Sequence, residues 1–416
     1  MVLHLLSSQQ ADFTVVGGGA AGFMAAITAA ESGVKNIFVL EATSKVLEKV
    51  RISGGGRCNV THASWVPKDL AVNYPRGKVH LLGPFSKFAT GDVVSWFAEH
   101  GLLLLEEKDG RMFPESNKSS DVVKCLRDSA IEAGVVILTN KNVVRIKSNS
   151  TYNFEVITKT GEVINSKNVL IATGGSRIGK ELAESLGHNI KRSVPSLFSF
   201  CLKQNLLSQC VGISIDNVSL KLIANNKTFL DNGSILITHK GLSGPAILRL
   251  SAFAANELYE VNYKSKLYIN WINETNASVT KLFNRFRYDF GRKKLFSSSP
   301  YVLLPKRLWL NFLVQSDIEN SARWADLRLK QEKNLINLLI NSQYLIFAKG
   351  PYGEEFVTAG GVNLDEVNLA CMQSKLCKGL FFAGEILNID GITGGFNFQH
   401  CWTSGWLVGK AVSEKN

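Results

Sequence analysis

The sequence predicts an α/β protein in which a Rossmann-like domain is interrupted by an inserted second domain. An apolar run at residues 13–16 is followed directly by the glycine pattern of residues 17–22 and an alanine-rich helical segment, the order of strand, tight turn and helix in such a domain. A second apolar run that ends in a glycine and an acid lies near the other end, at residues 380–385. Between them, from about residue 193 to 347, short alternating runs and then helical stretches indicate antiparallel strands and a helical part.

The composition is that of a globular protein with room for more than one domain. The chain has 416 residues, of which 45% are hydrophobic and 20% charged, which excludes a disordered chain and a small disulfide-rich scaffold. Its seven cysteines form no CxxC pair and no metal-site spacing with histidine, so we expect reduced thiols, no metal and a cytoplasmic location. The formal net charge of +12 favours anionic partners.

No leader and no membrane span are expected. Residues 1–10 contain no lysine or arginine and so lack the basic start of a signal peptide. The longest uncharged stretch, residues 13–30, is long enough to pass for a span. Its clustered glycines are explained instead by a turn between a strand and a helix.

The glycine pattern of residues 17–22 predicts a dinucleotide site. Gly17 allows the tight turn, Gly19 lets a pyrophosphate approach the backbone, and Gly22 lets helix and strand pack closely. The helix that follows offers free N–H groups to the phosphates. Glu41 ends the next apolar run, where an acid hydrogen-bonds the ribose; without a nearby arginine it suits FAD or NAD over NADP. The predicted contacts here are Gly17, Gly19, Ala20, Ala21, Gly22 and Glu41.

A second glycine-rich segment, residues 53–59, is predicted to be another cofactor contact. Three consecutive glycines are unfavourable inside a helix or strand and suit a loop that lies against an anion or a planar ring. A flexible surface loop is the alternative. Cys58 is interpreted as a packed residue rather than a redox thiol. We predict cofactor contacts at Gly55, Gly56, Arg57 and Cys58, with Arg57 and Asn59 also candidates for catalysis.

Two later segments extend the predicted site. The apolar run 169–172 ends in Thr173 and Gly174, at the strand edge where ligands bind in open α/β folds, although a simple turn is the alternative. The run 380–383 ends in a glycine and an acid, and a helix is predicted to start near Asn397, where its N-terminus would stabilise a reduced flavin. NAD would not need this second segment, whereas the longer FAD does. The contacts added are Val144, Thr173, Gly174, Gly384, Glu385, Gly394, Gly395, Phe396 and Asn397, the last also a catalytic candidate.

In these segments the sequence resembles the BaiN-like (YhiN-type) NAD(P)/FAD-dependent flavoproteins. The resemblance covers nearly the whole chain and departs at Leu47, at residues 176–180 and at Asn388, where the family has other residues. It implies a FAD enzyme with NADH or NADPH as electron donor and a small unsaturated or carbonyl-bearing organic substrate. The matching segments are Ser53–Asn59, Gly110–Pro114, Ala172–Gly175, Thr238–Pro245, Thr358–Val362 and Gly384–Asn397.

The domains are predicted on the same basis. Residues 1–190 and 348–416 would form a FAD-binding domain of the glutathione-reductase-like type. Residues 191–347 would form an inserted substrate or cap domain, with a small β-barrel and a helical part. In it, His239 could donate a proton near the flavin, with a structural hydrogen-bonding role as the alternative.

A basic stretch, residues 281–294, leaves another class of function open. It holds six basic residues and one acid, interleaved with four aromatic residues. We favour an amphipathic helix with a solvated basic face. Phosphate contacts and base stacking would instead fit a flavin-dependent tRNA-modifying or RNA-binding protein, so nucleic acid is not expected but stays an alternative. A non-catalytic flavin-binding redox sensor is the third hypothesis.

Overall fold

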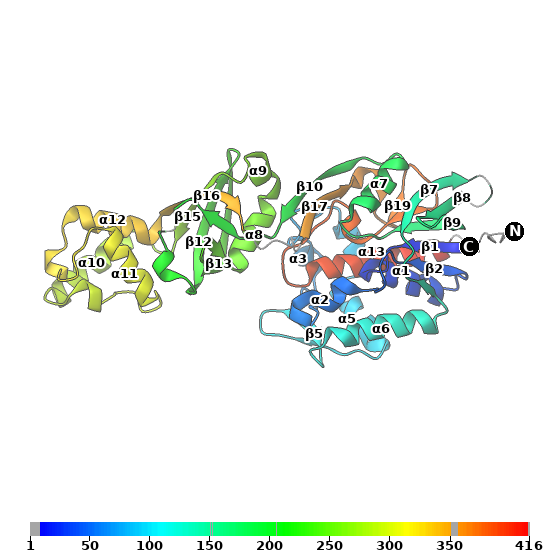
Figure 1. The fold of residues 1–416 in the computed structure, drawn as a ribbon. Coiled ribbons are helices and arrows are strands. Elements are labelled where there is room, and N and C mark those ends of the chain that lie inside the picture. The colour runs from blue at the N-terminus through cyan, green and yellow to red at the C-terminus, as the bar shows by residue number, and fades with distance from the viewer. Residues whose placement is uncertain (1–8, 150, 152, 205, 351–356, 415–416) are drawn as a thin grey trace. The chain divides into compact units, whose positions relative to one another are not determined.

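The computed structural model describes residues 9–149, 151, 153–204, 206–350 and 357–414; residues 1–8, which bear on the expected absence of a leader, lie outside them. The chain divides into two compact units, one of Met1–Ser193 with Thr358–Asn416 and one of Val194–Val357 (Figure 1). The second boundary lies beyond the predicted residue 348. Strand β16 (Ser342–Lys349) stays paired with β11 (Phe200–Leu202) as far as Lys349, so the barrel itself extends past residue 348.

The first unit is built on a mixed sheet with the strand order β18-β19-β20-β9-β1-β2-β6, to which the β7–β8 hairpin is added through β9. The central strands are parallel: Val16 lies opposite both Leu40 and Ile171, and Phe382 lies opposite Ile171. Since β6 is parallel to β2 as well, the carboxyl ends of five parallel strands meet at one edge. The strands are β1 (Gln9–Val16), β2 (Ile37–Leu40), β6 (Val136–Leu138), β7 (Val143–Asn149), β8 (Asn153–Thr158), β9 (Val163–Ile171), β18 (Val367–Asn368), β19 (Gln373–Ser374) and β20 (Leu380–Phe382).

Helices α1 (Ala20–Glu31) and α13 (Phe396–Ser413) pack closely against each other beside this sheet. An added Cβ at Gly405 would lie 2.5 Å from the Ala21 carbonyl oxygen, and one at Gly409 would lie 2.8 Å from that of Ala25. These glycines thus allow α13 to approach α1.

The remaining elements of this unit surround the sheet and connect its strands. They are the helices α2 (Glu48–Gly56), α3 (Pro67–Ala71), α4 (Leu82–Phe85), α5 (Thr90–Glu99), α6 (Ser119–Glu132) and α7 (Arg177–Ser185), the strands β3 (Thr61–His62), β4 (Leu104–Glu106) and β5 (Arg111–Pro114), which form a small sheet, and the 3-10 turns η4 (Leu364–Glu366) and η5 (Gly384–Ile386). The two-stranded sheet of β10 (Ile190–Ser196) and β17 (Val357–Val362) lies where the chain passes between the units.

The second unit contains a closed barrel with the order β11-β14-β13-β12-β15-β16 and a group of helices. One apolar core runs through both, with Phe283, Trp309 and Trp324 fully buried in the helical part. The further elements are β12 (Ser214–Ala224), β13 (Lys227–Ile237), β14 (Gly241–Ser243), β15 (Ser265–Asn270), α8 (Pro245–Phe253), α9 (Ala255–Glu260), α10 (Asn276–Phe290), α11 (Lys306–Gln315), α12 (Leu329–Ile340), η1 (Ser208–Cys210), η2 (Leu295–Ser297) and η3 (Trp324–Asp326).

The predicted fold class, a Rossmann-like domain with an inserted barrel and helical part, is confirmed. Within the described part of the chain, no helix combines the length and the apolar character needed to cross a membrane.

Candidate functional site

The carboxyl edge of the sheet holds the first glycine turn. Gly17 has φ +115°, a conformation open to glycine, and its N–H donates to the Leu40 carbonyl at 2.9 Å. An added Cβ at Gly17 would lie 2.4 Å from the Ala172 carbonyl oxygen. The turn is therefore wedged between the ends of β2 and β9, and it directs the chain into α1.

The N-terminus of α1 faces open space at this edge. Gly19 is its N-cap and no side chain caps the first turn, so the N–H groups of Ala20 and Ala21 lack partners within the helix. An added Cβ at Gly19 would meet no atom within 4 Å, whereas one at Gly22 would lie 2.2 Å from the Gly17 carbonyl oxygen. Gly22 thus serves packing, as predicted, and Gly19 borders a space that can admit a ligand.

Glu41 is held at the end of β2 by backbone donors. Its Oε2 accepts from the Gly18 N–H at 2.9 Å, and its Oε1 accepts from the Thr43 N–H and hydroxyl at 2.9 Å each. The carboxylate is therefore fixed beside the glycine turn, in the position where an acid can reach a ribose.

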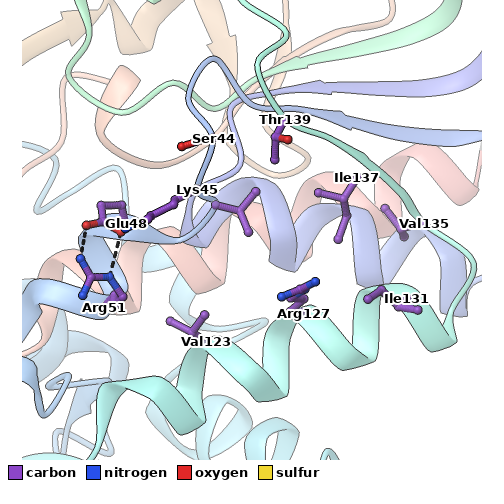
Figure 2. Close-up of a pocket in the computed structure, with 11 residues that line it drawn as sticks. Ser44, Lys45, Glu48, Arg51, Val123, Arg127, Ile131, Val135, Ile137 and Thr139 are labelled. Atoms are coloured by element: carbon purple, nitrogen blue, oxygen red, sulfur yellow. Dashed lines mark hydrogen bonds and ion pairs between the residues drawn. The ribbon is translucent and has the colours of Figure 1, made fainter.

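A cavity of about 590 Å³ opens beside the segment that follows Glu41. Figure 2 shows its side chains along that segment and along α6. Arg51 is paired with Glu48, whereas Arg127 has no ion-pair partner among the described residues. None of the predicted site residues lines this cavity, and its basic side chains add positive potential near the edge. The lining residues are Ser44, Lys45, Val46, Glu48, Arg51, Val123, Arg127, Ile131, Val135, Ile137 and Thr139.

The ends of β9 and β20 bring two more predicted segments together. An added Cβ at Gly174 would lie 3.2 Å from Oε2 of Glu385, and that oxygen accepts from Lys49 Nζ at 2.6 Å. The Thr173 hydroxyl is buried and has no hydrogen-bond partner. Gly384 lies against α1, because an added Cβ there would be 3.0 Å from Cβ of Ala21.

The backbone leaves the helical conformation at Ser53, Gly54 and Gly55, at the end of α2. The loop that results, residues 53–59, combines open glycines with a buried amide. Added Cβ atoms at Gly55 and Gly56 would meet nothing within 4 Å. The Asn59 Oδ1 atom is buried without a hydrogen-bond partner. Burial raises the pKa of the Cys58 thiol to about 12, so it stays protonated at neutral pH, in line with the interpretation as a packed residue.

Arg57, in contrast, is directed toward the β4–β5 hairpin. Its guanidinium pairs with Glu107 at 2.5 Å, donates from Nε to Asn117 Oδ1 at 3.0 Å and lies 3.9 Å from the ring centre of Phe113. These contacts hold the loop to the hairpin. A direct role of Arg57 at the cofactor stays a prediction.

The C-terminal glycine loop, residues 390–397, is held by hydrogen bonds and an ion pair at both of its ends. The Asn397 amide exchanges two hydrogen bonds of 2.9 Å with the backbone of Gly391, so its side chain is used within the loop. The Tyr74 hydroxyl donates to the Phe396 carbonyl at 2.6 Å, and Arg76 forms a buried ion pair with Asp390. The loop enters α13 through Gly395, the N-cap.

His62 contacts the middle of the same loop. Its Nδ1 lies 3.0 Å from the Gly394 carbonyl oxygen, and its ring stacks on Phe396 at 4.7 Å between ring centres. Sequence reasoning missed His62, Tyr74 and Arg76, because their contacts join positions more than 300 residues apart and leave no local pattern.

Behind the loop, α13 buries its polar residues. Gln399 is fully buried and bonds to Thr61 and Thr403. His400 is 1% exposed, and burial lowers its pKa to about 4. His400 is therefore uncharged at neutral pH, and its ring is part of the buried face of α13.

Two predicted residues take no part in these contacts. Val144 lies on β7 with its side chain 48% exposed. His239 is exposed and follows β13 in the second unit. The structure thus gathers the segments around Gly19, Glu41, Asn59, Glu385 and Gly395 in the first unit, whereas the roles of Val144 and His239 stay predictions.

The gathered residues fit a dinucleotide cofactor. Open space at Gly19, Gly55 and Gly56 leaves room for a ligand against the backbone, and the free helix N-terminus suits phosphates. Buried polar atoms are normally hydrogen-bonded, so the unpartnered Asn59 Oδ1 in the loop of residues 53–59 is free to take a partner. The Thr173 hydroxyl, in contrast, is packed against Gly179 of α7. Among the described residues no group of three His, Cys, Asp or Glu side chains is placed to hold a metal ion.

Comparisons with known proteins agree with this picture. A 3-dehydro-bile acid delta(4,6)-reductase of Clostridium scindens is 29% identical over 96% of this chain and 98% of its own. A ribosomal RNA dihydrouridine synthase of Haemophilus influenzae is 26% identical over 98% of this chain and 100% of its own. The crystal structure of a 3-ketosteroid delta1-dehydrogenase from Sterolibacterium denitrificans superposes with a TM-score of 0.53 at 11% identity over 98% of this chain and 100% of its own, which shows a shared fold.

The resemblance noted in the sequence is confirmed at the level of the family. The model described as the HI0933-like protein Rossmann domain matches residues 11–411. Together with the relatives, it indicates a FAD-dependent oxidoreductase, as the sequence predicted. The chain belongs to the HI0933-like family.

Proposed function

We propose that the protein is a FAD-dependent reductase that saturates a carbon–carbon double bond conjugated with a carbonyl, using NADH or NADPH as electron donor. The two relatives support this substrate class, because one is named for reducing the double bonds of a 3-dehydro-bile acid and the other for making dihydrouridine. Each name describes a reaction in which a ring loses a conjugated double bond. The observation that carries the cofactor assignment is the unpartnered, buried Oδ1 atom of Asn59, in a loop whose Gly55 and Gly56 border open space.

In this proposal the part of the sheet edge formed by β1, α1 and β2 binds the ADP portion of FAD. The N-terminus of α1 with Gly19 holds the pyrophosphate by free N–H groups. Glu41, already fixed by the Gly18 and Thr43 N–H groups, accepts from the ribose hydroxyls. Because its carboxylate is bound before the ligand arrives, little reorganisation is needed on binding.

The ends of β9 and β20, together with the loop around Asn59 and the loop before α13, hold the ribityl chain and the flavin ring. Glu385 faces Gly174 at the end of β9 and is our candidate for the ribityl hydroxyls. Asn59 offers its amide to the ring edge. Asn397 acts as a positioning residue, since its amide is spent on Gly391, and the N-terminus of α13 places a positive dipole end where negative charge develops.

FAD, when bound, supplies hydride transfer through N5 of its ring. The chain orients the ring against the glycine loops and excludes water from its buried side. A proton must reach the second carbon of the double bond. His239 is the sequence's candidate for that proton, and its role is tested by the pH dependence of turnover in His239→Asn.

Asn59 and Thr14 provide a matched test of the cofactor site. Asn59→Leu removes a buried amide oxygen that has no partner in the cofactor-free protein, so we expect little change in the stability of the apoprotein but about 2- to 10-fold weaker FAD binding, the value of one hydrogen bond. Thr14→Val removes an equally unpartnered buried hydroxyl from the middle of β1. It should leave FAD affinity unchanged. Equal FAD affinity in both variants would contradict the assignment.

The reaction is tested by product analysis. The FAD-loaded protein is incubated without oxygen with NADH or NADPH and a cyclic conjugated enone, and the product is examined by mass spectrometry. We expect a gain of two hydrogen atoms. A substrate that instead loses two hydrogens would make the enzyme a dehydrogenase, and no turnover with any donor would favour a non-catalytic redox sensor.

A second candidate function is reduction of a uracil base within RNA. The observation that favours it is the concentration of positive charge in the helical part of the second unit, together with the name of the Haemophilus influenzae relative. Uracil carries the same conjugated double bond, so the flavin chemistry would be shared.

A further inference from the structure

The positive charge of the chain is concentrated in one lobe. We define the helical lobe as residues 276–341, which comprise α10, α11 and α12 (Figure 1). It holds 12 Lys and Arg residues against five Asp and Glu residues, a net charge of +7 out of +12 for the whole chain. A sixth of the molecule therefore carries more than half of its excess charge.

Part of that charge is neutralised inside the lobe. Arg285 pairs with Asp289 at 3.3 Å, and Arg287 pairs with the buried Glu332 at 2.5 Å. The other four basic side chains of residues 281–294 are exposed and form no ion pair among the described residues. These unpaired cations are Lys281, Arg292, Lys293 and Lys294.

A hollow of about 420 Å³ lies at the end of α10 and is lined by two of these cations. Tyr288 and Phe290 line it together with Arg292, Lys293 and Asp289, whose carboxylate is paired with Arg285. The Tyr288 side chain is 91% exposed, and Lys293 Nζ lies 4.4 Å from the ring centre of Phe290. The hollow thus places aromatic faces directly beside positive charges.

The other aromatic residues of the stretch are not available to a ligand. Phe283 is fully buried, and Phe283 and Phe286 pack on Trp324 with ring centres 5.2 and 5.4 Å apart. The predicted amphipathic helix is therefore present, and its apolar face is used by the core. Because that face is already buried, α10 cannot insert it into a membrane surface.

We propose that the helical lobe is a docking surface for single-stranded RNA. Lys281, Arg292, Lys293 and Lys294 bind backbone phosphates, and one base stacks on the exposed ring of Tyr288. An exposed aromatic face among unpaired cations suits a polyanion that also carries planar bases. The proposal deepens the second candidate function, but RNA binding itself requires no redox chemistry.

The test measures RNA binding by the full-length, FAD-loaded protein. A fluorescein-labelled single-stranded RNA of about 20 nucleotides is titrated by fluorescence anisotropy over a range of salt concentrations. We expect the triple variant Arg292→Gln, Lys293→Gln, Lys294→Gln to bind at least tenfold more weakly at low salt. Its plot of log affinity against log salt should be shallower by about 2, because each single-strand phosphate contact contributes about 0.7.

Tyr288 is tested separately. Tyr288→Ala should weaken binding about fivefold or more with an unchanged salt slope, since stacking is not electrostatic, and Tyr288→Phe should retain most of the affinity. The matched control removes three exposed lysines from the first unit, Lys35→Gln, Lys147→Gln and Lys378→Gln. It changes the net charge equally without altering the helical lobe, so it should bind within about twofold of the original protein.

Three results would overturn the proposal. They are unchanged RNA binding in the triple variant, an equal loss in the lysine control, and binding to phosphatidylserine vesicles but not to RNA. The vesicle arm is needed because Val302 and Leu303 are 96% and 95% exposed in the same lobe. The flavin spectrum and its bleaching by NADH or NADPH are recorded for every variant. Loss of bleaching with intact RNA binding would refute only the proposed reaction, whereas intact bleaching without RNA binding refutes only this surface.

Discussion

The substitution Gly19→Ala tests whether Gly19 is needed for cofactor binding or for the packing of the glycine turn. An added Cβ at Gly19 meets no atom within 4 Å in the cofactor-free protein, and the residue has an ordinary φ of −96°. The apoprotein should therefore lose at most about 1 kcal/mol, the cost of alanine at a helix N-cap. The same methyl group would occupy the space that a pyrophosphate needs, and overpacking costs about 1–3 kcal/mol. We expect FAD binding to weaken about 5- to 150-fold.

Gly22→Ala should behave in the opposite way. Its added Cβ would lie 2.2 Å from the Gly17 carbonyl oxygen, so the backbone must shift whether or not a cofactor is bound. The apoprotein itself should lose about 1–3 kcal/mol. Gly91→Ala is the control, because its added Cβ also meets nothing within 4 Å but lies in α5.

Two measurements on the three variants decide the matter. Thermal unfolding of the apoprotein reports packing, and FAD titration followed by flavin fluorescence reports the site. The reasoning would be refuted by a Gly19→Ala protein that is folded and binds FAD as tightly as the original protein. A loss of affinity in Gly91→Ala would show that the assay responds to general destabilisation.

Three further substitutions test the loop at the start of α13 and the helix behind it. Tyr74→Phe removes the donor to the Phe396 carbonyl and should cost about 1–3 kcal/mol in denaturant unfolding, the penalty of an unsatisfied buried acceptor; no change would mean that another donor replaces the hydroxyl. Arg76→Leu takes the ion-pair partner from Asp390, which is 1% exposed, and should cost about 3–5 kcal/mol, with partial recovery in the double variant with Asp390→Asn. Burial lowers the pKa of His400 from 6.5 to about 4, so the unfolded chain takes up a proton that the folded protein does not, and stability should fall by about 1.4 kcal/mol per unit as the pH drops from 6.5 to 4. Unfolding of His400→Asn should lack this part of the pH dependence, and an identical pH profile would contradict it.

The parts of the site that sequence reasoning predicted are those encoded over short distances. The strand, turn and helix around Gly17–Gly22 and the acid at Glu41 follow one another within one supersecondary unit, so spacing alone locates them. The inserted barrel was predictable because alternating runs in β12 and β13 show the period of strands.

The directions of individual side chains could not be predicted. The residue types at Arg57 and Asn397 singled out two loops, but the guanidinium turns to Glu107 and the amide to Gly391. Which way each side chain points depends on neighbours brought in by tertiary folding, such as the β4–β5 hairpin. The basic stretch shows the same limit, because the burial of Phe283 and the exposure of Tyr288 depend on where α10 meets the core.

The central claim, a flavin at the carboxyl edge of the sheet, is tested most directly by the visible spectrum of the purified protein. We predict a yellow protein, or one that becomes yellow on loading with FAD, whose absorbance bleaches on anaerobic addition of NADH or NADPH. A coloured protein that does not bleach would keep the flavin and contradict the proposed electron donor. A protein that stays colourless after incubation with FAD would contradict the account of the site itself.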